Sequence, residues 1–118
     1  MPIAIASDHA GYDLKEQLKQ AFTDIEWLDL GTHGSASVDY PDFGFAMGQA
    51  ITEGKAQQGI VICGSGIGIS IAANRFDAVR AALCTNSTMA RLSRQHNDAN
   101  VLAPVSYTHL TLPTILLV

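Results

Sequence analysis

Three alternate glycines, Gly64, Gly66 and Gly68, come directly after a short apolar run, residues 60–63. An apolar run of roughly four to eight residues bounded by glycine is typical of a buried strand, and the small apolar residues 69–73 predict a helix after the glycines. Glycine lets the backbone adopt positive φ and approach a ligand closely, so such a loop points N–H groups outward. Helix N-termini of this kind attract phosphate. The stretch predicts an α/β fold with an anion site beside a cysteine and a serine.

The glycine pattern alone does not identify a ligand. G-S-G-I-G is not the G-x-G-x-x-G of dinucleotide-binding folds, and position 84, about 20 residues beyond Gly64, is Cys84 rather than an acidic residue that could hold a ribose. No Gly-Lys-Ser/Thr follows, which argues against a P-loop. A tight strand-to-helix turn without a ligand is the alternative interpretation of this stretch.

The rest of the chain alternates strand patterns with helix patterns. Strands are predicted at residues 3–7, 25–30, 60–63, 79–84 and from 101 on. Helices are predicted at residues 14–22, 43–51 and 69–73, and after a cap at Thr85 or Asn86. This alternation predicts a parallel sheet with helices on both faces. Ligands of such folds bind beyond the carboxyl ends of the strands, where polar clusters at 7–11, 31–42 and 63–68 converge.

Helical spacing also predicts which faces are buried. In the first helix Lys15, Glu16 and Lys19 are expected on the solvent side. In the last helix the inner face is expected to consist of two apolar residues and a histidine: Met89, Leu92 and His96.

Composition excludes several classes of partner. A net charge of −4 argues against binding to nucleic acid or to an anionic membrane surface, which both require a basic field. No stretch approaches the roughly 18–20 apolar residues of a membrane span. Two cysteines without a recognisable signal peptide predict free thiols and a cytoplasmic protein.

The last fifteen residues break the pattern. Residues 104–118 carry no Lys, Arg, Asp or Glu, contain two prolines and have no helical period. We expect one domain at 1–103 and a tail at 104–118 that is foreign to the fold, such as the product of a frame shift, in place of the helix that should cover the last strand. A genuine C-terminal strand is the alternative.

Four motifs together resemble the type B ribose-5-phosphate isomerases, whose wider family includes galactose-6-phosphate isomerase subunits. They are S-D-H-A-G at 7–11, D-Y-P-D at 39–42, I-C-G-S-G-I-G-I-S-I-A-A-N-R at 62–75 and S-R-Q-H-N-D-A-N-V-L-A at 93–103. The resemblance implies a Rossmann-like three-layer α/β/α fold with a five-stranded parallel sheet. It also implies a homodimer or tetramer with active sites at the subunit interface, and no metal, nucleotide or other cofactor.

The resemblance implies roles for the glycine-rich stretch. Cys63 matches the base that moves a proton between C1 and C2 of the open-chain sugar phosphate, a task suited to a thiolate. Ser65 and the N–H groups around Gly64, Gly66 and Gly68 match the site that stabilises the enediolate oxygen. A buried structural cysteine and a simple turn serine are the alternatives for these two side chains.

Other motif residues match substrate contacts. His96 matches the histidine that opens the furanose ring, donated across the dimer interface, with Asn97 beside it; a histidine stabilised at a helix C-terminus is the alternative. Asp8 matches the carboxylate that binds sugar hydroxyls or the ring oxygen, although it could instead cap the following helix. His9 matches a residue near the phosphate, and Tyr40 a substrate contact.

The chain departs from the family at its C-terminus. Family members bind the phosphate through arginines that follow the His-Asn motif, whereas this chain has Tyr107 at the first such position and does not reach the others. We therefore expect ribose-5-phosphate isomerisation with activity impaired by the tail. Isomerisation of galactose or allose 6-phosphate and a non-catalytic phosphosugar-binding module are the alternatives. Ser70, one turn into the helix after the glycines, is expected either to hold a hydroxyl of the sugar or to lie on the helix surface. Cys84 is expected in the core, Asn74 and Arg75 are expected to be structural, and His33 and His109 have no expected role.

Overall fold

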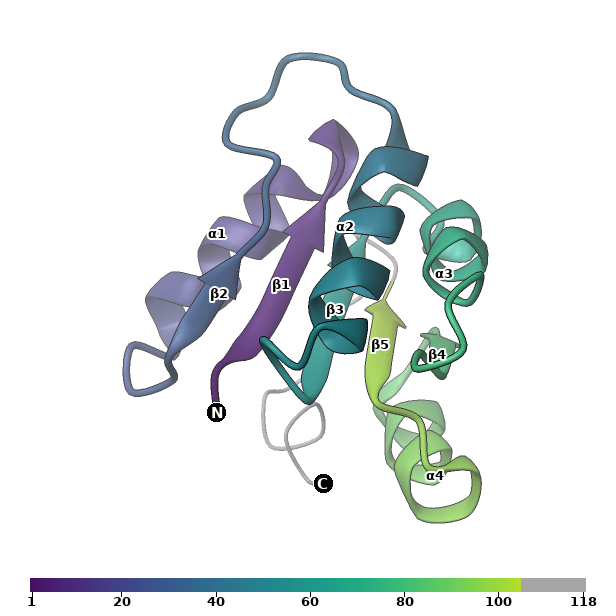
Figure 1. Cartoon of the computed structure of the whole chain (residues 1–118). Coiled ribbons are helices and arrows are strands. Elements are labelled where there is room, and N and C mark those ends of the chain that lie inside the picture. The colour runs from purple at the N-terminus through teal and green to yellow at the C-terminus, as the bar shows by residue number, and fades with distance from the viewer. Residues whose placement is uncertain (105–118) are drawn as a thin grey trace.

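The computed structural model describes residues 1–104, which form a three-layer α/β/α domain (Figure 1). The strands are β1 (Ile3–Ser7), β2 (Trp27–Asp29), β3 (Gln58–Ile62), β4 (Ala81–Cys84) and β5 (Val101–Pro104). The helices are a short 3-10 turn, η1 (His9–Gly11), and α1 (Tyr12–Ala21), α2 (Tyr40–Thr52), α3 (Ile67–Ala73) and α4 (Ser87–Asn97). Pro104, where the predicted tail begins, is the last residue of β5, and residues 105–118 lie outside the described part of the chain.

All five strands are parallel, in the order β2-β1-β3-β5-β4. Helices α2 and α3 cover one face, where Met47 and Ile69 join the core, and α1 and α4 cover the other, where Leu18 and Ala90 do so. The predicted fold class is confirmed. Because β2 lies on one side of β1 and β3 on the other, the strand order reverses at β1, and ligands of doubly wound sheets bind at such a switch point. Among the described residues, no helix is long and apolar enough to cross a membrane.

Helix α2 begins earlier than the spacing predicts. Tyr40 and Pro41 form its first turn instead of the end of a loop. Proline suits this position because the N–H that it lacks would have no partner inside the helix. The start of α4 is as predicted, since the Asn86 side chain accepts a 2.9 Å hydrogen bond from the Met89 N–H.

The inner face of α4 differs from the prediction. Met89, Leu92 and His96 are exposed, and Ala90 and Ser93 are buried. These two small side chains lie one turn apart, and the Ser93 hydroxyl donates to the Ala90 carbonyl at 2.7 Å, so it needs no solvent. Small residues on the inner face let the helix lie close to the sheet, and this contact decides the orientation.

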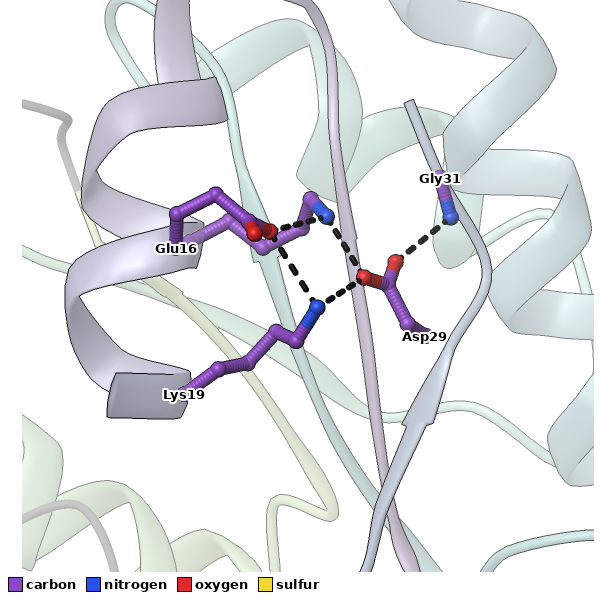
Figure 2. A network of polar contacts seen from close by, with 5 residues as sticks. Glu16, Lys19, Asp29 and Gly31 are labelled. Carbon is purple, nitrogen blue, oxygen red and sulfur yellow. Dashed lines mark hydrogen bonds and ion pairs between the residues drawn. The ribbon is translucent and has the colours of Figure 1, made fainter. Parts of the chain in front are cut away.

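A second correction concerns Lys15, which is fully buried although it was expected in solvent. Its ammonium donates to Asp29 Oδ2 at 2.7 Å and to Glu16 Oε2 at 2.9 Å. Lys19 contacts the same two oxygens, at 2.6 Å and 3.2 Å, as Figure 2 shows. The Gly31 N–H donates to the other Asp29 oxygen at 2.9 Å. The network joins α1 to the edge strand β2, and the charge of the buried lysine is paired.

Ionisation of this network follows from its contacts. Burial acts to raise the pKa of Asp29, but hydrogen bonds from Lys15, Lys19 and Gly31 outweigh it and lower the pKa from 3.8 to about 2. The hydrogen bond from Lys15 lowers the pKa of Glu16, and the bond to Asp29 raises the pKa of Lys19. All three groups are therefore held in their charged forms at neutral pH.

Candidate active site

An open cavity of about 550 Å³ lies at the carboxyl edge of the sheet. Its lining comes from the segments that follow β1 and β3 and from the first turns of α2 and α3: Asp8, Ala10, Tyr40, Cys63, Gly64, Ser65, Ile67, Gly68 and Ile71. Parallel strands bring their carboxyl ends to one edge, which is why three motifs far apart in sequence meet here. Six of the predicted site residues therefore share one cavity.

Cys63 directly follows β3 and is a free, buried thiol. Its side chain belongs to the core cluster on the α2–α3 face and also lines the cavity, so it is anchored by packing at the base of the site. The other thiol, Cys84, is buried in the cluster on the opposite face, and burial raises its pKa. The two cysteines thus occupy separate environments, and Cys63 alone of the two lines this cavity.

Asp8 acts as a cap and lines the cavity as well. Its Oδ1 accepts a 3.1 Å hydrogen bond from the Gly11 N–H, and its own N–H donates to the Ile62 carbonyl at 3.1 Å. Gly11 is required there, because an added Cβ would lie 2.6 Å from the Ile62 oxygen. The nearly buried carboxylate is fixed through one oxygen, and a carboxylate has a second oxygen that can accept a bond from a ligand.

The glycine-rich loop has a distinct task at each position. Gly66 adopts φ +76°, where L-residues are strained, and starts α3; it is not among the lining residues. The Ser65 hydroxyl accepts a 3.2 Å hydrogen bond from the Ile67 N–H and can still donate its own proton. At Gly68 an added Cβ would lie 2.5 Å from the Tyr40 ring, so the ring packs directly on the loop backbone. Ser70 is structural, since its hydroxyl donates to the Ile67 carbonyl at 2.7 Å.

Four predicted site residues do not line the cavity: Gly66, described above, and His9, His96 and Asn97. His9 follows Asp8, but its ring hydrogen-bonds Val38 in the loop before α2. His96 and Asn97 end α4, which runs back from the carboxyl end of β4 to the amino end of β5, at the opposite edge of the sheet (Figure 1). There Arg80 donates twice to the Asn97 carbonyl, at 2.7 Å and 3.0 Å.

Sequence reasoning missed three cavity residues, Ala10, Ile67 and Ile71. The two isoleucines lie one turn apart on α3 and are more than half exposed, so with Tyr40 they form an apolar rim. The helix was predicted to begin at residue 69, whereas α3 begins at Ile67. With the observed start, the apolar pair Ile67 and Ile71 at i, i+4 is the available signal. Within residues 1–104, no group of three or more His, Cys, Asp or Glu side chains has the arrangement of a metal site.

Comparisons with known proteins identify the family of this chain. The family model described as Ribose/Galactose Isomerase matches residues 3–107. Ribose-5-phosphate isomerase B of Escherichia coli is 45% identical over 103 residues, which are 86% of this chain and 69% of that protein.

Solved structures show the same fold. The ribose-5-phosphate isomerase B structure from Clostridium thermocellum is 56% identical with a TM-score of 0.84, covering 87% of this chain and 71% of that one. The enzyme from Thermotoga maritima is 44% identical with a TM-score of 0.89, covering 98% and 85%. The enzyme from Mycoplasma genitalium, solved with ribulose-5-phosphate bound, is 38% identical with a TM-score of 0.84, covering 92% and 74%. With its switch-point cavity, its strand order and its glycine-rich loop, the chain belongs to the ribose/galactose isomerase family.

Proposed function

We propose that this chain interconverts ribose 5-phosphate and ribulose 5-phosphate through an enediolate, with Cys63 as the base. The observation that carries the proposal is the placement of this thiol in one cavity with a fixed carboxylate and the glycine-rich loop. The bound ribulose-5-phosphate in the Mycoplasma genitalium relative supports the choice of a five-carbon sugar phosphate.

The reaction needs one group that carries a proton between adjacent carbons. The Cys63 thiolate removes the proton from C2 of the open-chain aldose, and the electron pair moves through the C1–C2 bond onto the carbonyl oxygen. Return of the same proton to C1, with transfer of the hydroxyl proton from O2 to O1, gives the ketose. Ser65 and the loop backbone line the wall where the oxyanion forms, and donors placed there are worth about 3 kcal/mol each. The fixed Asp8 carboxylate orients the sugar hydroxyls.

The test compares two buried cysteines. Cys63→Ala is expected to lower kcat by at least about a hundredfold, the usual contribution of a catalytic base, while sugar phosphate still binds. Cys84→Ala, on the opposite face of the sheet, is the matched control and should retain turnover per folded molecule. Undiminished turnover in Cys63→Ala would disprove the base assignment. Binding without turnover in the unsubstituted chain would favour the phosphosugar-binding module.

Phosphate binding is tested with a second form of the protein. The positions at which family members carry phosphate-binding arginines fall after residue 104, and residues 104–118 of this chain contain no arginine. We therefore propose to assay this chain beside a chimera whose residues after Ala103 come from the Escherichia coli relative. Higher activity in the chimera is expected if the tail impairs phosphate binding. Ribose 5-phosphate is compared with allose and galactose 6-phosphate in both forms.

The working unit is proposed to be a cytoplasmic homodimer in which each chain completes the site of the other. Support comes from the apolar rim of Tyr40, Ile67 and Ile71 around the cavity, and from His96 and Asn97 at the far edge of the sheet. Mixing Cys63→Ala with His96→Ala chains then creates heterodimers that hold one intact site. An equal mixture should regain about a quarter of the unsubstituted activity, since half of the dimers are mixed and each has one working site. No recovery would show that both groups act within one chain.

A further inference from the structure

The loop between β2 and α2, residues 30–39, is hydrogen-bonded at both ends to residues at the end of β1 and the start of η1. At its start the Ser7 N–H donates to the Gly31 carbonyl at 2.7 Å, and the Thr32 N–H donates to the Ser7 carbonyl at 2.8 Å. At its end the loop is attached through His9 and Val38. Between these points residues 33 and 35–37 are exposed. The His9–Val38 contact therefore fixes the part of the loop that leads into α2.

The N–H and the carbonyl of Val38 both face one nitrogen of the His9 ring. The Val38 N–H points at His9 Nδ1 over 3.1 Å, and the Val38 carbonyl lies 3.2 Å from the same nitrogen. A nitrogen that accepts from an N–H carries no proton, so acceptance of the Val38 N–H by Nδ1 requires the neutral ring to hold its proton on Nε2. In the protonated ring Nδ1 could instead donate to the Val38 carbonyl. One ring nitrogen thus holds the loop in either state.

The contact lies two residues before Tyr40. The Tyr40 side chain lines the cavity, and its ring packs on the Gly68 backbone with no room for a Cβ between them. Two contacts therefore restrain Tyr40. Its ring packs on Gly68, and its backbone follows Val38, which is hydrogen-bonded to His9. Loss of the bond between His9 and Val38 would give the backbone of Tyr40 more freedom.

We propose that His9 is a positioning residue that fixes Tyr40 at the cavity by binding Val38 through Nδ1, and that this bond sets the Nε2–H tautomer of the ring. The effect on substrate rests on the proposed isomerase function; the contact itself does not.

Two substitutions separate the nitrogens. The amide of asparagine reaches about as far from Cβ as Nδ1, and that of glutamine as far as Nε2, so His9→Asn can keep the bond to Val38 and His9→Gln cannot. Amide exchange of Val38 is measured by NMR in the full chain without ligand. Exchange should be about three- to tenfold faster in His9→Gln and His9→Ala, and close to the unsubstituted rate in His9→Asn. Long-range nitrogen–proton correlation should show the proton of the neutral His9 ring on Nε2. Unchanged Val38 exchange in both His9→Gln and His9→Ala, or a proton on Nδ1, would overturn the proposal.

The effect on substrate is measured as a double-mutant cycle. His9→Gln should raise KM for ribose 5-phosphate several-fold with little change in kcat, because it releases Val38 and so loosens Tyr40, while Cys63 and the glycine-rich loop stay in place. In the Tyr40→Phe background, His9→Gln should have no further effect on KM. The reason is that the Tyr40 hydroxyl, which His9→Gln is expected to displace, is already absent there. Additive effects on KM would overturn the link to Tyr40. If the unsubstituted chain does not turn over ribose 5-phosphate, the proposed function fails, and the exchange measurement still decides the His9–Val38 contact.

Discussion

Asp29→Asn tests the network that joins α1 to β2. The substitution keeps the shape of the side chain and an oxygen that can accept from the Gly31 N–H, but it removes the charge that faces Lys15 and Lys19 (Figure 2). Because Lys15 is fully buried, its ammonium is then left with Glu16, whose side chain is 32% exposed against 18% for Asp29. The variant therefore weakens the pairing of a buried charge.

The size of the loss follows from the pKa of Asp29. A fall from 3.8 to about 2 in the folded protein corresponds to about 2.4 kcal/mol of stability at neutral pH. Loss of one partner of a buried ion pair costs about 3–5 kcal/mol, an upper limit here because Glu16 still binds Lys15. We expect Asp29→Asn to lower the free energy of unfolding by about 2–3 kcal/mol at pH 7.

The same pKa fixes the dependence on pH. A lowered pKa means that the ionised Asp29 stabilises the fold fully above its unfolded value and progressively less as pH falls toward 2. The contribution should be about 1.3 kcal/mol at pH 3, so the stabilities of the two proteins converge in acid.

Urea unfolding, followed by circular dichroism and by the fluorescence of Trp27, measures the difference at pH 7, 4 and 3. Glu26→Gln is the matched control: Glu26 is exposed next to β2 and has no ion pair among the described residues. A loss below about 0.5 kcal/mol at pH 7, the scatter of surface substitutions, would refute the reasoning, as would a loss that does not shrink in acid.

Two further predictions concern the site and α4. Gly68→Ala places a Cβ 2.5 Å from the Tyr40 ring, so it should displace Tyr40 and reduce kcat/KM for ribose 5-phosphate by about tenfold or more, at a cost of about 1–3 kcal/mol in unfolding free energy; activity equal to that of the unsubstituted chain would contradict the packing. Asn86→Ala removes the bond to the Met89 N–H and should cost about 1 kcal/mol by thermal unfolding, whereas Asn86→Ser should recover most of it.

Local patterns were sufficient for the order of the elements, and together with the resemblance they named six of the nine residues that line the cavity. The β-branched run before Gly64 forms β3, and the rule that parallel strands end at one edge correctly brings Asp8, Tyr40 and Cys63 together. Periodicity predicted the wrong buried face where two faces of a helix have similar patterns of apolar residues. On α4 the large residue Leu92 gave the stronger signal, but the small Ala90 allows the closer approach to the sheet.

Long-range pairing was beyond the reach of local patterns. A lysine in a run of charged residues predicts a solvent-exposed side chain, and only the contact of α1 with β2 shows that Asp29 lies opposite Lys15. The bond between His9 and Val38 joins residues 29 positions apart, and no periodicity indicates it. Both contacts fix loops or edges around the sheet rather than its core.

The topology also explains why the fourth motif stands apart from the other three. Three motifs follow strands or begin helices at the carboxyl edge, whereas His96 and Asn97 end an eleven-residue helix that returns to the amino edge. Such a helix spans about 16 Å, which places its two ends near opposite edges of the sheet. In the proposed dimer each chain would receive a His-Asn pair at one edge and supply its own from the other. This arrangement requires a two-fold axis. If residue i of one chain contacts residue j of the other, the axis makes residue j of the first chain contact residue i of the second. The proposed symmetric dimer would therefore form two equivalent cavities at once, and neither chain would complete one alone.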